Sequence, residues 1–123
     1  MTGRADHVLI GVTLAAVLAG CGGQPAFVIA GASPQRGEQA IESYGCGACH
    51  LVPGITGARG MAGPPLTNWA QRGIIAGHLP NTPDNLVAWI MDPPRYSPGT
   101  AMPKLGVSEA EARDMAAYLY TLR

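Results

Sequence analysis

The pentapeptide Cys46-Gly47-Ala48-Cys49-His50 constrains this chain more than any other stretch. Two cysteines three positions apart, with a histidine directly after the second, form the C-x-x-C-H pattern of covalent c-type haem attachment. Each thiol can add to one haem vinyl group, and the adjacent imidazole can then ligate the iron from one face. The pattern predicts one covalently bound haem c, held by Cys46 and Cys49, with His50 as an iron ligand.

Two other uses of a paired-cysteine motif fit the rest of the sequence less well. A structural zinc site needs four ligands, and the chain has no second cluster of cysteine and histidine to supply them. A thiol–disulfide exchange motif is expected beside a βαβ pattern, and no such pattern surrounds these cysteines.

Length and composition agree with a small haem domain. The chain has 123 residues, which favours one domain, and a net charge of +0 with 13% charged residues, which does not favour nucleic-acid binding. Its 17 glycines and 11 prolines indicate short helices joined by loops. A domain of this size buries little apolar surface by itself, and a bound haem would add a large apolar body to its core.

Residues 1–20 are predicted to be an export signal. Arg4 precedes an apolar run, residues 8–18, that is too short to span a bilayer but suits a signal peptide. The run ends in Leu18-Ala19-Gly20-Cys21, which resembles the bacterial lipobox, where cleavage precedes the cysteine and the thiol is acylated. Three cysteines leave one unpaired after the haem pair, and acylation of Cys21 would use it. An ordinary signal peptide with a stray cysteine and an uncleaved anchor remain alternatives.

The domain boundaries follow from composition. Residues 21–32 lack helix or strand periodicity and are predicted to be a flexible tether, although the sequence leaves open whether residues 27–29 lie against the domain. Residues 33–123 would form the haem domain. Helices are expected to begin after Ser33, Thr82 and Ser108, each a good N-cap residue. Residues 67–72 would add one or two helical turns, and the last helix would run to about Leu122.

No segment shows strand periodicity, so an all-α fold is expected. Residues 51–63, 73–81 and 95–103 are predicted to be loops. Gly37 lies inside the first predicted helix, where a glycine costs about 1 kcal/mol relative to alanine. Close approach of another helix would explain it.

The ligand on the second face of the iron determines the function, because a filled site suits electron transfer and an open one suits gas or peroxide chemistry. Met102 is the favoured ligand, since it lies in an irregular segment stiffened by Pro98 and Pro103. His78 lies in a loop and stays open as an alternative. The remaining candidates are Met61, Met91 and Met115. Met91 and Met115 lie on amphipathic helices, where a methionine usually belongs to the core.

The order of the motif, a Gly-Pro-x-Leu segment, and a Met-Pro loop before a C-terminal helix resembles class I cytochrome c. The resemblance covers residues 33–123. It implies thioether bonds to Cys46 and Cys49, axial ligation by His50 and Met102, and a Pro64 carbonyl that orients His50. It also implies that the first and last helices cross, with Gly37 and Ile41 against Leu119 and Tyr118.

The tract from Leu79 to Pro103 looks most like the cytochrome c domain fused to subunit II of caa3-type oxidases. A copper-binding domain and a membrane hairpin, which such a subunit carries, are not found in this sequence. The resemblance therefore implies a stand-alone relative of that domain.

Together these features predict a membrane-tethered, monomeric electron carrier with one haem, not an enzyme, in a respiratory chain. It would face the periplasm or the outer side of the cytoplasmic membrane. A terminal oxidase is the expected acceptor, and a quinol–cytochrome c reductase or a dehydrogenase the expected donor. Two alternatives stay open: a fixed haem subunit of an oxidase or dehydrogenase complex, and a ligand sensor or peroxidase-like enzyme with an open distal site.

Overall fold

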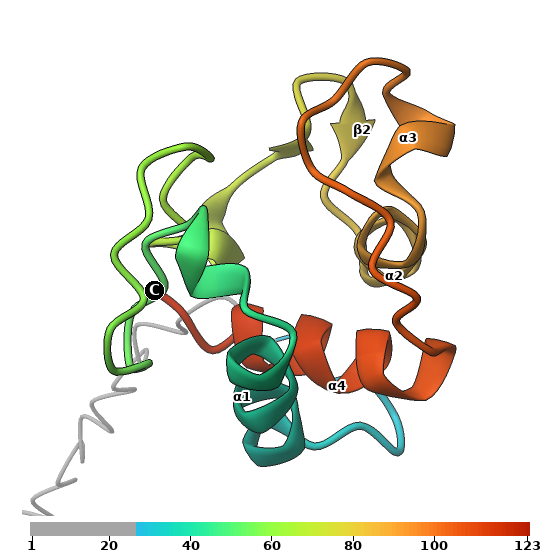
Figure 1. The fold of residues 1–123 in the computed structure, drawn as a ribbon. Helices are drawn as coiled ribbons and strands as arrows, with labels where there is room; N and C mark the ends of the chain where they lie inside the picture. The colour runs from blue at the N-terminus through green and yellow to red at the C-terminus, as the bar shows by residue number, and fades with distance from the viewer. Residues whose placement is uncertain (1–26) are drawn as a thin grey trace, which may run out of the picture.

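The computed structural model describes residues 27–123. The predicted signal peptide, Cys21 and the first part of the predicted tether lie outside these residues. The described part contains four α-helices, two 3₁₀ turns and one small sheet (Figure 1). In chain order they are α1 (Pro34–Ser43), η1 (Cys46–Ala48), η2 (Trp69–Gln71), β1 (Ile74–Ile75), β2 (Leu79–Pro80), α2 (Pro83–Met91), α3 (Pro93–Tyr96) and α4 (Glu109–Leu119).

The predicted caps begin the three main helices. In α1 the Ser33 hydroxyl accepts from the Arg36 backbone N–H at 3.2 Å, and in α2 the Thr82 hydroxyl accepts from Asn85 at 3.3 Å. Ser108 and Glu111 form the reciprocal capping box of α4. A proline stands at the first position of α1 and of α2, where no backbone donor is needed. The predicted starts of all three helices are thus confirmed.

Helices α1 and α4 cross tightly at the base of the molecule (Figure 1). A Cβ atom on Gly37 would lie 1.9 Å from the Asp114 carbonyl oxygen, so only glycine allows this approach. The predicted crossing of first and last helices is confirmed. Gly37 meets Asp114 and Met115, however, about one turn earlier in α4 than Tyr118 and Leu119, because the helices cross near the middle of α4.

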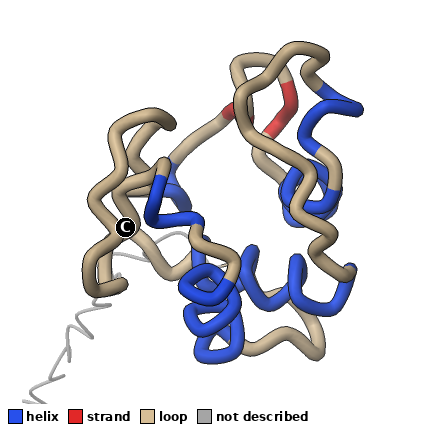
Figure 2. The backbone as a smooth tube through the Cα atoms, in the orientation of Figure 1, coloured by secondary structure: helices blue, strands red, loops and turns tan. Residues whose placement is uncertain are grey.

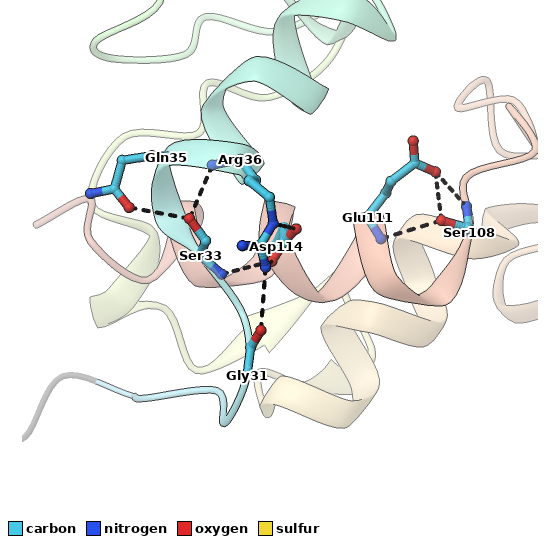
Figure 3. Close-up of polar contacts among 7 residues, drawn as sticks. All are labelled: Gly31, Ser33, Gln35, Arg36, Ser108, Glu111 and Asp114. Atoms are coloured by element: carbon cyan, nitrogen blue, oxygen red, sulfur yellow. Dashed lines mark hydrogen bonds and ion pairs between the residues drawn. The ribbon is translucent and has the colours of Figure 1, made fainter.

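The Asp114 carboxylate of α4 binds the start of α1 near this crossing (Figure 3). It accepts from the Ser33 backbone N–H at 2.7 Å and from Arg36 Nε and Nη2 at 2.7 and 2.8 Å. The Arg36 hydrogen bond holds the pKa of Asp114 below its ordinary value. Arg36 also donates to the Gly31 carbonyl at 3.3 Å. One buried carboxylate therefore fixes the start of α1 to α4.

The segment before α1 packs on the domain. Ile29 is buried in the core, and the Phe27 ring lies 4.8 Å from that of Tyr120. Arg113 on α4 donates to the Ala30 carbonyl at 3.0 Å. The described end of the predicted tether therefore contacts the domain from Phe27 onward, because its apolar side chains find a surface beside α4.

Two short elements occur where loops were expected. Residues 93–96 form α3, since Pro93 and Pro94 end α2 but occupy the opening positions of a new helical turn, which tolerate proline. Strands β1 and β2 pair antiparallel within the predicted loop 73–81, with Ile75 opposite Leu79. The all-α architecture is otherwise confirmed. Loops account for much of the remaining chain (Figure 2). None of the helices in residues 27–123 has the length and apolarity to cross a membrane.

Candidate haem site

A cavity of about 440 Å³ opens among the helices and loops of the domain. Its walls come from α1, α2 and α4 and from the loops around residues 62–66, 72–76 and 97–105. Most of the lining is apolar, with Ile41, Leu86 and Leu119 supplied by the three helices. The lining also includes all four residues predicted to hold a haem and its iron, Cys46, Cys49, His50 and Met102.

The turn η1 presents both cysteines to the cavity. Gly45 adopts the left-handed conformation, with φ of 70°, and ends α1, so that Cys46–Ala48 form a 3₁₀ turn. The His50 backbone N–H donates to the Cys46 carbonyl at 3.0 Å and closes the motif on itself. Both thiols are free; Cys46 is half-buried and Cys49 is exposed. Burial raises the pKa of the Cys46 thiol.

The loop after the motif folds back against it. Backbone donors of Gly60 and Gly63 bond to the carbonyls of Gly47 and Cys49 at 3.0 and 2.8 Å. A Cβ on Gly60 would lie 2.4 Å from the Cys49 carbonyl carbon, so the loop backbone at Gly60 is in contact with the backbone of the motif. This return explains why the loop is rich in glycine.

The same return sets the His50 ring. His50 Nδ1 lies 2.7 Å from the Pro64 carbonyl oxygen. Because a carbonyl only accepts, Nδ1 carries the proton and Nε2 keeps a lone pair for a metal. A Cβ on Gly63 would lie 2.4 Å from His50 Cε1, so the glycine backbone packs directly on the imidazole. The ring is thus held on two sides by the loop.

Met102 faces the cavity from the loop after α3. Its backbone N–H donates to the Thr100 hydroxyl at 3.3 Å, and Thr100 N–H donates to the Ser97 carbonyl at 3.0 Å. Lys104 Nζ lies 2.7 Å from Asp92 Oδ2 and ties the end of the loop to the α2–α3 junction. Met102 is half-buried. The loop that carries its sulfur therefore has its own internal restraints.

The other candidate iron ligands divide into two groups. Met115 of α4 also lines the cavity, whereas Met61, Met91 and His78 are absent from its lining. Met61 is 93% exposed, so its thioether points into solvent. The ring nitrogens of His78 lie 2.9 and 2.7 Å from the carbonyl oxygens of Ala76 and Tyr96, so the ring sits between two backbone carbonyls. Among the five candidates, Met102 and Met115 alone reach the cavity.

Trp69 provides a test of whether haem fits this cavity. Its side chain is 6% exposed and lines the cavity, and its Nε1–H is buried without a hydrogen-bond partner in the described part of the chain. Buried indole N–H groups normally find an acceptor. The peripheral oxygens of haem c are its propionate carboxylates, which only accept when ionised. An apolar cavity with two thiols, one imidazole and one unpaired donor matches the chemistry of that group.

Sequence reasoning gave Trp69 and Arg72 no role in binding a haem. Arg72 also lines the cavity and lies with its guanidinium carbon 5.1 Å from the centre of the Trp69 ring. A tryptophan three positions before an arginine, in a chain with 6% aromatic residues, was the available signal. That signal does not say which way the indole N–H points, because its direction is set by contacts distant in sequence.

Comparison with known proteins agrees with this geometry. A sequence model of the family described as "Cytochrome c" matches residues 34–123, which begin with α1 and include every site residue named above. The chain is also similar to "Cytochrome c oxidase subunit 2" of Alkalihalophilus pseudofirmus, with 42% identity over 89 residues. The aligned region covers 72% of this chain and 25% of that protein, so the chain spans about a quarter of that relative's length.

Proposed function

This chain belongs to the cytochrome c family, which binds covalently attached haem c, and from that premise we propose that it is a one-electron carrier. The observation that carries the proposal is a single cavity lined by Cys46, Cys49, His50 and Met102. Two protein ligands to one iron leave no position for a substrate. Such a site transfers electrons and does not transform a bound molecule.

Each residue has a proposed task. Haem c attached through Cys46 and Cys49 supplies the Fe(III)/Fe(II) couple. His50 would hold the iron through Nε2, and the Pro64 carbonyl fixes its tautomer by accepting from Nδ1 at 2.7 Å. Met102 would also hold the iron, through its thioether, which would favour the reduced iron and raise the potential. The restrained loop around Met102 lowers the entropy lost when this weak ligand binds.

An apolar rim around the cavity is the proposed docking surface. Ile74 and Leu105 line the cavity and are 51% and 43% exposed. Lys104, adjacent to Leu105, is paired with Asp92. The net charge of +0 gives little long-range steering. Contact with a redox partner would therefore rest on a small apolar surface and be short-lived.

A terminal oxidase is the proposed electron acceptor. The similarity to an oxidase subunit supports this assignment. The test is anaerobic mixing of the reduced holoprotein with a bacterial cytochrome c oxidase, followed by admission of oxygen. We expect fast haem oxidation that requires the oxidase. Equal oxidation rates with and without the oxidase would contradict the proposal.

Matched variants of the holoprotein separate docking from chemistry. Ile74→Asp adds a charge to the rim and should slow oxidation by the oxidase severalfold, with the reduction potential measured beside the rate so that any change in driving force is accounted for. Val28→Asp adds the same charge to a residue that is 89% exposed and absent from the cavity lining, and should leave the rate unchanged. Equal slowing by both variants would indicate that the rim is not the docking surface.

We further propose that Cys21 is acylated and holds the carrier at the cell-envelope membrane, facing outward. The sequence Leu18-Ala19-Gly20-Cys21 and the odd number of cysteines support this assignment. A tether raises the concentration of the carrier near membrane partners and offsets its weak steering. Membrane fractionation of cells expressing the full chain should find the Cys21→Ser variant released. Retention of that variant in the membrane would contradict lipid anchoring at Cys21.

A fixed subunit of an oxidase complex is the second candidate function. It is supported by the name of the similar protein, which is an oxidase subunit. For such a subunit the sequence favours an exposed apolar patch around Met61, Trp69 or Tyr96. Met61 is 93% exposed, but Trp69 is buried. Stoichiometric co-purification with an oxidase in mild detergent would favour this candidate over a free carrier.

A further inference from the structure

Residues 27–33, which we call the strap, lie along α4 in the opposite chain direction. At one end the centre of the Phe27 ring lies 4.8 Å from that of Tyr120, and further on the Ala30 carbonyl accepts from Arg113 at 3.0 Å. Between these two contacts the strap advances by three residues, which span about 10 Å when extended. Over the same contacts α4 runs back by seven residues, which span about 10.5 Å. The matching lengths indicate that the strap follows α4 antiparallel to it.

The strap is fixed to the domain at several further points. Ile29 is 7% exposed and belongs to the hydrophobic core. The Gly31 carbonyl accepts from Arg36 at 3.3 Å, and the Ser33 N–H donates to the Asp114 carboxylate at 2.7 Å (Figure 3). Because core packing and hydrogen bonds both hold the strap, it moves together with the domain.

The outer side of the strap is apolar and has a cation beside it. Val28 is 89% exposed, and Phe27 stays 49% exposed although its ring lies against Tyr120. Arg113 donates to a neutral carbonyl and forms no ion pair with a residue that the structure describes. We call Phe27, Val28 and Arg113 the strap face. Apolar side chains beside a cation without an acidic partner suit the boundary between lipid headgroups and acyl chains.

The length of chain between Cys21 and the strap limits where the strap face can lie. Cys21 and Phe27 are six residues apart, so their Cα atoms are at most about 20 Å apart in any conformation of the residues between them. A small domain is about 30 Å across. If Cys21 is held at a membrane, this short connection does not allow the strap to lie on the side of the domain that faces away from the lipid.

We propose that the strap face rests on the phospholipid bilayer, with Phe27 and Val28 among the headgroups and Arg113 at the lipid phosphates. The inference rests on the proposed membrane anchor at Cys21 and deepens it, because it assigns the side of the domain that meets the membrane. It does not depend on the iron ligand opposite His50 or on the identity of the redox partner.

This placement directs the cavity away from the lipid. Neither the strap nor Arg113 contributes to the cavity lining, which takes Met115 and Leu119 from α4. The contacts of α4 with the strap come from Arg113 and Tyr120. At 100° per residue, these two pairs of side chains leave the helix in directions about 130° apart. Helix α4 therefore lies between the strap and the cavity, and a domain resting on the strap face keeps the cavity rim free for a partner.

The test is photolabelling of the full-chain holoprotein, held by its own anchor on vesicles of phosphatidylcholine and phosphatidylglycerol. The vesicles contain a lipid with a photoactivatable group near its headgroup, and mass spectrometry of the digested protein locates the label. We expect severalfold more label on the α4 peptide with Arg113 than on the peptide with Met61, which is 93% exposed. Arg113 is far from Cys21 in sequence, so its label does not follow from the short connection alone. Equal labelling of the two peptides, or an unlabelled α4, would overturn the proposal.

Matched substitutions test whether the strap side chains make the contact. Val28→Asp places a negative charge among the headgroups and should reduce the label on α4 severalfold. Met61→Asp makes the same kind of change at a similarly exposed residue and should leave that label unchanged. Both side chains are almost wholly exposed, so neither substitution removes core packing. A Val28→Asp protein that is labelled like the wild type would overturn the proposal. Because the effect needs a bilayer, Val28→Asp stays a neutral control for docking on an oxidase dissolved in detergent.

Chemical coupling separates this proposal from the acylation of Cys21. Where cells leave Cys21 unmodified, its thiol can be coupled to a maleimide-bearing lipid in the same vesicles, which restores a membrane attachment at that residue. The same labelling pattern is then expected. Missing acylation together with this pattern would contradict the anchor and support the strap contact. Acylated protein with equal labelling of α4 and the Met61 peptide would contradict the strap contact and support the anchor.

Discussion

Gly63 shows how one missing side chain determines the geometry of the site. Its backbone packs on the His50 ring, and an added Cβ would lie 2.4 to 2.9 Å from three ring atoms. That ring cannot turn away without losing its hydrogen bond to the Pro64 carbonyl at 2.7 Å. The position therefore links the loop conformation to the orientation of the iron ligand.

We expect Gly63→Ala to lower the yield of correctly ligated holoprotein and to destabilise it by about 1–3 kcal/mol, the usual cost of overpacking. Visible spectra and urea unfolding measure these effects. Gly73→Ala is the control, because Gly73 has no heavy atom within 4 Å of the added Cβ and no positive φ. Equal behaviour of the two variants would show that contact with His50 does not restrict this position.

At the residue scale, the sequence predicts the groups whose chemistry depends on local spacing. The cysteines and His50 are adjacent in the chain, so their joint presence at one cavity follows from a pentapeptide. The hydrogen bond from the Tyr120 hydroxyl to Asn81, by contrast, joins residues that are 39 positions apart in the sequence. A contact over that distance exists only after the helices have packed.

At the scale of elements, the α1–α4 crossing organises the base of the molecule. Gly37→Ala would bring a Cβ to 1.9 Å from a backbone oxygen, which cannot move without displacing α4. We expect a loss of about 3 kcal/mol or more, at the upper end of overpacking costs. Thermal unfolding of the holoprotein measures it. Gln39→Ala, at an exposed position of the same helix, should change stability by at most about 0.5 kcal/mol.

The Asp114 contacts predict a pH dependence of stability. Hydrogen bonds from Arg36, and then from Ser33, lower the pKa of Asp114 in the folded state relative to about 3.9 in an unfolded chain. The contribution of Asp114 to folding stability is therefore complete above the pKa of the unfolded state, and it is lost as the pH falls through the lower pKa of the folded state. Asp114→Asn should be less stable than wild type at neutral pH, and the difference should shrink in acid.

Urea unfolding of both proteins from neutral to acidic pH checks this expectation. The difference between the two proteins isolates Asp114 from Asp92 and Glu111, whose pKa values are also lowered, by Lys104 and Ser108. A difference that stays constant with pH would contradict the account.

The starts of the three main helices were predictable because helix caps are local. Helix α3 and the small sheet were not predictable. Ser33, Thr82 and Ser108 bond to donors three residues ahead, which a sequence shows directly. The β1–β2 pairing depends on a turn in which Ala76 takes a positive φ of 51°, a conformation that its residue type disfavours. Context outside the segment decides such a turn.

At the scale of the whole molecule, the fold surrounds its cofactor. A cavity of about 440 Å³ with a mostly apolar lining opens at its centre, and without haem that lining would face water. The sequence indicated this dependence through its low aromatic content and many glycines and prolines.

We therefore expect the Cys46→Ala/Cys49→Ala double variant, purified without haem, to lose cooperative thermal unfolding and near-UV circular dichroism. It should bind a dye specific for exposed apolar surface. Wild-type holoprotein is the control. A sharp, cooperative transition in the haem-free variant would show that the polypeptide does not need the cofactor for its core.

The central claim, an iron held by His50 and Met102, is tested most directly by visible spectra of the oxidised and reduced holoprotein. We predict a low-spin c-type spectrum, with a weak sulfur-to-iron charge-transfer band that disappears in Met102→Ala and persists in Met115→Leu. Carbon monoxide should bind the reduced wild type slowly and the Met102 variant rapidly. A high-spin spectrum in the wild type with rapid carbon monoxide binding, or a band lost in Met115→Leu alone, would contradict the account.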